Sequence, residues 1–223
     1  MTHVLAVVTD RAHARFFDVG ASEAVELTSL QSPAGRGGRF HSDRGDSPGW
    51  GEHAYHARRE EEARRHVAAI VERLAAFERQ HPGADVLLAG PGTTAGALQR
   101  ALPPALGQRV IGTARLSPLE VTPATVHQTA TQVRAAHERA TQRTLVAAVL
   151  EGLGTGRAEN GVRAVLRALA RGQVRQLLIP ADVADVFQTA ADAARRQGAS
   201  VTFLDDAGIA QPIEGLAALL RWS

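Results

Sequence analysis

The sequence predicts an α/β protein with two domains, and three observations support this prediction. Short runs of β-branched and apolar residues alternate with longer segments of helical periodicity. The chain has 223 residues, of which 44% are hydrophobic, enough for a substantial buried core. Thr122-Pro123, an N-cap followed by proline at the first helical position, opens a second run of helices and strands. We therefore expect domains at residues 1–121 and 122–223.

The first domain begins with three predicted strands. Residues 3–8, 13–19 and 24–30 are short apolar or alternating runs, separated by tight turns and ended by Pro33. Closely spaced strands of this kind predict an antiparallel meander.

A long charged helix is predicted over residues 52–80. Glu60→Arg64 and Glu61→Arg65 are ion pairs of favourable i,i+4 order. A strand at 85–89, a helix from the turn at 90–94 to residue 102, and a strand at 109–112 follow. The order β-β-β-α-β-α-β is that of a ribonuclease-H-like layered fold.

The second domain is predicted to be a smaller α/β/α sandwich. It starts with a long helix at 122–151, whose 3.5-like repeat suits either a bridge between the domains or pairing with another chain; we favour the bridge. A helix near 162–169, a strand at 176–179, a helix at 182–197 and a strand at 200–204 follow. The pattern at 213–222 fits strand and helix equally well.

Composition excludes several classes of chemistry. The chain has no cysteine, so it has no disulfide, thiolate nucleophile or cysteine-ligated zinc. All 25 Lys/Arg residues are arginine, and the formal net charge is +2. A GC-rich genome explains this bias more simply than selection for RNA binding. The first residues lack a basic n-region and a membrane-length apolar run, so we expect a cytoplasmic protein without membrane attachment.

The glycine- and arginine-rich loop at 33–51 is the candidate functional segment. Its glycines prevent it from burying itself, and its arginines favour a polyanionic partner. We expect the RNA-phosphate contacts to come from five arginines, Arg36, Arg39, Arg44, Arg58 and Arg59. We expect the loop's flexibility and close approach to come from Gly35, Gly37 and Gly38.

Other candidate sites are weaker. His53, His56 and Glu60 could ligate a metal from one helix, but solvated or RNA-facing histidines, including His41 and His66, fit the pattern better.

Carboxylates for a two-metal nuclease do not assemble convincingly from the sequence; the candidates are Asp10, Asp18, Glu62 and Asp85. The turn at 90–94 could bind phosphate, although a structural turn between strand and helix is the better interpretation. We assign no catalytic residue, metal or cofactor.

Several segments together resemble one protein family. The strand-turn-strand at 8–17, the glycine loop leading into the Arg/Glu-rich helix at 56–66, and Leu-Ala-Gly-Pro-Gly at 88–92 are similar to the central domain of archaeal and eukaryotic class-one peptide release factors, their Pelota relatives and bacterial offshoots. Residues 161–179 and 217–222 resemble that family's C-terminal domain.

The resemblance implies a ribosome-binding protein whose central-domain loop enters the peptidyl transferase centre and whose C-terminal domain contacts partner proteins, with a translational GTPase as a possible delivery partner. It also implies that residues 216–222 form a strand. The family's catalytic Gly-Gly-Gln is replaced by Gly37-Gly38-Arg39. Since the chain starts on the central domain's first strand, we expect no codon-reading domain.

Three functions are compatible with these features. The first is a ribosome-binding, translation-associated factor of the hibernation or rescue type. The second is an enzyme, either a peptidyl-tRNA ester hydrolase that uses Arg39 or His41 in place of glutamine, or a metal-dependent nuclease. The third is a stress-response interaction module whose loop no longer binds RNA. We favour the first.

Overall fold

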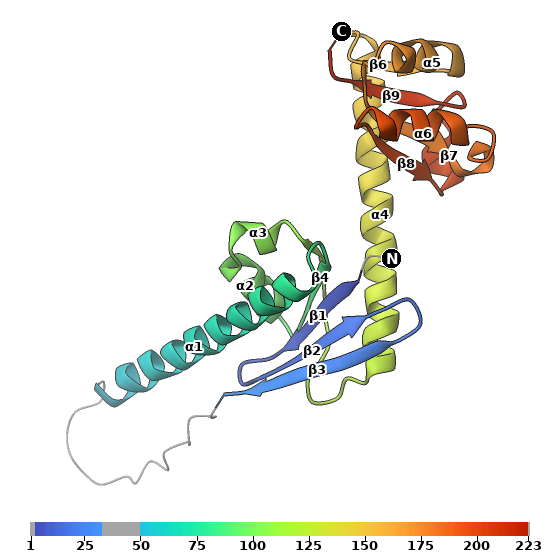
Figure 1. Cartoon of the computed structure of the whole chain (residues 1–223). Helices are drawn as coiled ribbons and strands as arrows, with labels where there is room; N and C mark the ends of the chain where they lie inside the picture. The colour runs from blue at the N-terminus through green and yellow to red at the C-terminus, as the bar shows by residue number, and fades with distance from the viewer. Residues whose placement is uncertain (1–2, 33–49, 223) are drawn as a thin grey trace, which may run out of the picture. The chain divides into compact units, whose positions relative to one another are not determined.

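The computed structural model describes residues 3–32 and 50–222, with the side chains of 50–56 and 58 left out (Figure 1). The chain divides into two compact units, Met1–Ala135 and Ala136–Ser223. The division falls within helix α4, Pro123–Leu153. The expected domain boundary at residue 122 stays a prediction. Within the described ranges, no helix is both long and apolar enough to cross a membrane.

The first unit is built on a five-stranded mixed sheet with the order β3-β2-β1-β4-β5. Its strands are β1 Val4–Thr9, β2 His13–Val19, β3 Ala24–Gln31, β4 Asp85–Ala89 and β5 Val110–Ala114. The pairs β1–β2 and β2–β3 are antiparallel, whereas β1–β4 and β4–β5 are parallel. This confirms the predicted ribonuclease-H-like arrangement, an antiparallel meander extended by parallel strands.

Helices cover both faces of this sheet. The central strand β1 therefore buries its side chains on both faces. Val4, Ala6 and Val8 pack with residues of α4, whereas Val7 packs against the helices of the opposite face. The opposite face is covered by α1 Trp50–Gln80, α2 Thr94–Ala101 and α3 Pro104–Gly107. The first unit therefore has three layers.

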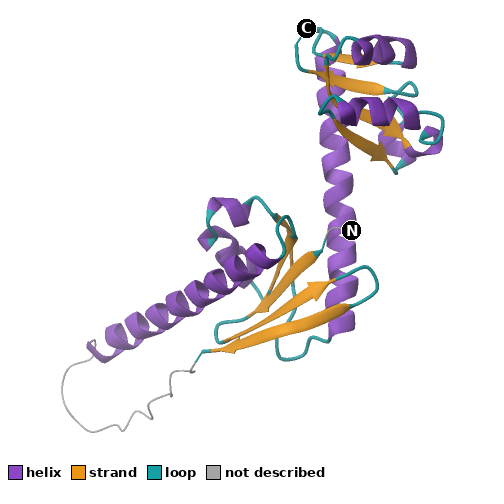
Figure 2. Cartoon of the chain, in the orientation of Figure 1, coloured by secondary structure: helices purple, strands orange, loops and turns teal. Residues whose placement is uncertain are grey.

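The second unit is the predicted α/β/α sandwich (Figure 2). Its strands are β6 Ala158–Asn160, β7 Val174–Pro180, β8 Ser200–Leu204 and β9 Ala217–Leu220. They lie in the order β6-β9-β7-β8, and only β7 and β8 pair in parallel within this sheet. Leu177 and Ile179 face α5 (Val162–Ala170) and α6 (Gln188–Arg196), whereas Leu178 faces α7 (Ala207–Ala210) and the end of α4.

Two segments of this unit test the sequence predictions, with one confirmed and one wrong. Residues 217–220 form a strand, as the resemblance implies, because β9 is paired on both sides and covered on both faces. The helix expected at 182–197 is wrong in its first half: a 3₁₀ turn, η1 Ala181–Val183, precedes α6. The backbone leaves helical geometry at Phe187, where φ is −104° and ψ is 17°.

Candidate functional site

One edge of the five-stranded sheet carries the root of the glycine–arginine loop. β3 ends at Gln31, which pairs with His13, and β1 ends at Thr9. The parallel strands β4 and β5 finish at the same edge, where Ala89 pairs with Ala114. We call this side of the first unit the loop edge. Residue 32 is the last described residue before the loop.

A buried histidine on α1 joins the ends of β1 and β3 at the loop edge. The His66 Nδ1 atom lies 2.7 Å from Ser32 Oγ, and its Nε2 atom lies 3.3 Å from Thr9 Oγ1. The Thr9 hydroxyl donates to the carbonyls of Asp10 and His13, so it accepts from His66 Nε2–H. Nδ1 is then free to accept from the Ser32 hydroxyl. Both nitrogens of the neutral imidazole therefore have a hydrogen-bond partner.

Burial dominates the electrostatics of this histidine. His66 is only 3% exposed. Burial lowers its pKa below the ordinary value, because a charged imidazolium loses its hydration; the carbonyl of His13 and the carboxylate of Asp10 oppose this only in part. His66 therefore holds the loop root as a neutral group.

The burial of His66 corrects the expectation that it is solvated or faces RNA. His66 lies one helical turn before Ile70 and two before Leu74, both of which are buried in the core beneath α1. The i,i+4 spacing from this apolar stripe is the sequence signal that would have placed it inside.

The predicted loop residues lie outside the described part of the chain; these are Arg36, Arg39, Arg44, Gly35, Gly37 and Gly38. The side chain of Arg58 is also outside it. Arg59 lies exposed on α1.

Further along α1, Arg65 Nε donates to Glu61 at 3.0 Å, as predicted, while Arg64 lies 3.8 Å from Glu61 rather than pairing with Glu60. Part of the positive charge on α1 is therefore compensated within the helix.

The residues considered for metal-dependent chemistry are dispersed. Asp10 lies at the loop edge, whereas Asp18 contacts His3 at the other end of β2, near Asp85 at the start of β4. Among residues 3–32 and 50–222 with described side chains, no group of three His, Asp or Glu is placed to share a metal ion. The side chains of His41, His53 and His56 lie outside that set.

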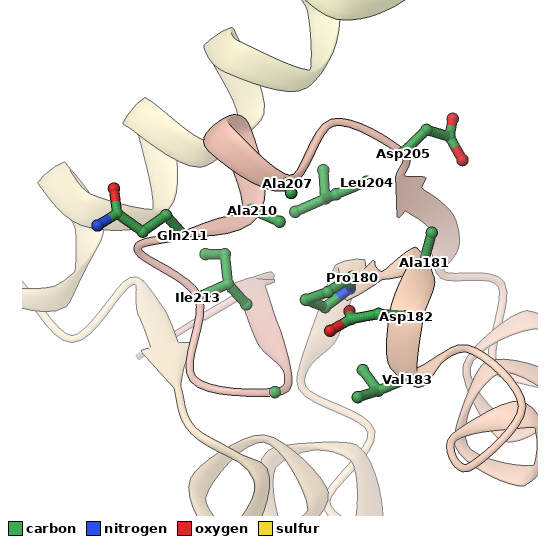
Figure 3. A pocket seen from close by; sticks show the side chains of 11 residues that line it. Pro180, Ala181, Asp182, Val183, Leu204, Asp205, Ala207, Ala210, Gln211 and Ile213 are labelled. Atoms are coloured by element: carbon green, nitrogen blue, oxygen red, sulfur yellow. The ribbon is translucent and has the colours of Figure 1, made fainter.

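The second unit contains a separate hollow of about 340 Å³ at the carboxyl ends of β7 and β8 (Figure 3). Pro180, Leu204 and Ile213 give it an apolar wall. The Asp182 carboxylate points into it, whereas Asp205 points away (Figure 3). The hollow thus combines an apolar surface with a single inward carboxylate.

A ribonuclease-H-like domain with a loop between its third strand and first helix, followed by an α/β/α sandwich, defines the class of release-factor-like proteins. The model of bacterial archaeo-eukaryotic release factor family 10 matches residues 2–142, and the chain belongs to this family. No curated protein matches the sequence.

Solved structures support the fold. Archaeal Pelota, in a model of ribosome-bound Pelota and ABCE1, aligns with a TM-score of 0.62 and 20% identity over 98% of this chain and 61% of that chain. Dom34 of S. cerevisiae aligns with a TM-score of 0.65 and 13% identity over 98% of this chain and 63% of that chain. The chain therefore spans less than two thirds of the length of these proteins.

Proposed function

We propose that this protein is a ribosome-binding, translation-associated factor of the hibernation or rescue type. The observation that carries the proposal is the match to the release factor family over residues 2–142, which includes the glycine–arginine loop and both of its roots. The fold shared with archaeal Pelota, which is described in a model of ribosome-bound Pelota and ABCE1, supports the same conclusion.

The proposed RNA contacts are made by the arginines of the loop and of the first turns of α1, namely Arg36, Arg39, Arg44, Arg58 and Arg59. The structure supports this role through the loop's roots. One root is held by His66 at the end of β3, and the other continues into the 31-residue helix α1. A loop carried by two ordered elements is presented to its partner at lower entropic cost than a free tail.

Binding without hydrolysis is the expected outcome. In release factors a Gly-Gly-Gln tripeptide occupies this loop, whereas here Gly37-Gly38 is followed by Arg39. An arginine offers a permanent positive charge for phosphate contacts. For delivery to the ribosome we propose a translational GTPase; Dom34, which has the same fold, is described as interacting with Hbs1.

Sedimentation with purified ribosomes through sucrose gradients tests the proposal. The full chain is compared with an Arg36→Ala/Arg39→Ala/Arg44→Ala variant over a salt series. We expect the variant to sediment less and its log–log salt slope to be shallower by about 2, since each phosphate contact on single strands contributes about 0.7. A matched control replaces by alanine three exposed arginines, Arg163 and Arg167 of α5 and Arg171 at its C-cap.

The state of the ribosomes used in the assay distinguishes a hibernation factor from a rescue factor. A hibernation factor binds vacant ribosomes, whereas a rescue factor prefers ribosomes stalled with peptidyl-tRNA. Failure of the wild-type chain to sediment with either kind at low salt overturns the proposal. Release of peptide from the stalled complexes above the blank would replace it with the esterase function.

A further inference from the structure

Two adjoining hollows run along the loop edge. The first, of about 480 Å³, lies between the β1–β2 turn at 10–13 and the turn after β4. The second, of about 420 Å³, lies between that turn, α2 and the end of β5. Gly92 and Thr93 line both hollows. We call these two adjoining hollows together the edge trough.

Arginine side chains give the edge trough its charge. Arg11 lines the first hollow, and Arg100 and Arg115 line the second; all three are exposed. The Arg100 Nη1 atom comes within 3.8 Å of the position that a Cβ on Gly96 would occupy. The Arg100 guanidinium is therefore folded back along α2 toward Gly96, which also lines the second hollow, rather than extended beyond the end of the helix.

The one carboxylate among the described residues that line the trough is already engaged. Asp10 Oδ1 accepts the backbone N–H groups of Ala12 and His13, each at 2.7 Å. Its Oδ2 lies 3.3 Å from His13 Nδ1. Burial alone would raise the pKa of Asp10, but these hydrogen bonds outweigh burial and lower it. The Asp10 carboxylate is therefore hydrogen-bonded within the turn at residues 10–13. The remaining charged side chains of the trough lining are arginines.

The backbone leaves the trough open for a ligand. The turn after β4 packs directly on the end of β1, and this close approach requires glycine at residue 90. A Cβ on Gly90 would lie 2.4 Å from the Thr9 carbonyl oxygen. A Cβ on Gly92, whose φ is +56°, would meet no atom within 4 Å. The hydroxyl-bearing residues Thr93 and Thr113 line the space beyond it.

We propose that the edge trough binds the phosphodiester backbone of RNA, with Arg100 and Arg115 as the principal phosphate ligands, and that it extends the RNA-binding surface of the glycine–arginine loop. Guanidinium groups suit phosphate oxygens. The one ring among the described residues of the lining, the imidazole of His13, lies 3.3 Å from Asp10 Oδ2, so the lining offers no row of rings on which successive bases could stack. Binding should therefore be independent of sequence.

The position of the trough favours RNA over an acidic peptide. The arginine-rich loop begins after β3 at the same edge, so its arginines and those of the trough can contact one extended polyanion. This part of the inference rests on the proposed function.

The test compares two charge-reversed variants of the full chain that have identical net charge. Arg100→Glu/Arg115→Glu alters the trough. Arg73→Glu/Arg79→Glu alters exposed positions in the last turns of α1, at the other end of the sheet. Fluorescence anisotropy measures binding to a labelled twelve-residue oligouridylate between 50 and 200 mM salt, and ribosome sedimentation is measured in parallel. Circular dichroism checks that both variants are folded.

For the trough variant we expect at least about a tenfold weaker oligonucleotide affinity and a salt slope shallower by about 1.4, with the control within about twofold of wild type. Unchanged affinity, or an equal loss in both variants, overturns the inference. So does displacement of the oligonucleotide by inorganic phosphate or by polyglutamate at equal concentrations of anionic groups.

The two proposals fail differently. If the loop variant loses ribosomes while the trough variant keeps both ribosomes and oligonucleotide, the trough inference fails and the proposed function stands. If the trough variant loses the oligonucleotide but the wild-type chain does not sediment with ribosomes, the proposed function fails and the trough stands as an RNA site.

Discussion

Replacing His66 by leucine should release the root of the loop and remove a pH-sensitive contribution to stability. The substitution breaks the hydrogen bonds of Nδ1 to Ser32 and of Nε2 to Thr9. At about 0.5–1.5 kcal/mol for each buried hydrogen bond, the free energy of unfolding should fall by about 1–3 kcal/mol at pH 8.

The pH dependence has a definite sign. Burial lowers the pKa of His66 in the folded state, so on acidification the unfolded chain takes up the proton first. The stabilisation is complete above the unfolded value of about 6.5 and is lost as the pH falls toward the folded value, at up to about 1.4 kcal/mol per pH unit. Asp10 has a lowered pKa, and its contribution changes only near and below 3.8.

Urea unfolding followed by circular dichroism between pH 8 and pH 5 measures both effects, and hydrogen exchange of residues 24–32 localises them to β3. The Asp10 carboxylate and the His13 imidazole are the charged or titratable side chains that act electrostatically on His66. A His13→Asn variant therefore serves as the control for the contribution of the His13 imidazole. A His66→Leu variant that retains the wild-type slope between pH 6.5 and pH 5 would refute the assignment.

Two further predictions concern packing and the ion pairs of the first unit. A Cβ at Gly112 would lie 2.6 Å from Val133 Cγ1, so Gly112→Ala should lower the free energy of unfolding by about 1–3 kcal/mol, and Val133→Ala should restore part of the loss in thermal melts. Arg15 pairs through two nitrogens with Glu26 and also donates to the Val121 carbonyl at 2.7 Å. Arg15→Lys should therefore destabilise more than Glu26→Gln; the reverse order in urea unfolding would contradict this account.

Periodic elements were predictable because their signal is local. The alternation in β2 and the apolar stripe of α1 are visible within single windows of sequence, and both elements lie where they were expected. β6 was missed because it has three residues, two of them polar, and owes its strand conformation to pairing with β9.

The site was less predictable than the fold, because its parts come from different elements. The loop was recognisable from composition, and its place before a charged helix pointed to the release factor family. Arg100 and Arg115 carry no motif of their own. They line one hollow because β4 and β5 are parallel neighbours, which brings the helix after one strand beside the end of the other.

The sequence alone determined the order of the strands in the first unit, the arginine-rich loop and the absence of glutamine after Gly37-Gly38. These are properties of consecutive residues. Only the tertiary structure decided that His66 is a buried anchor rather than a solvated histidine, and that arginines line hollows at the same end of the sheet as the loop's root. Burial and hydrogen-bond partners depend on residues distant in the chain, and strand pairing is what brings those residues together.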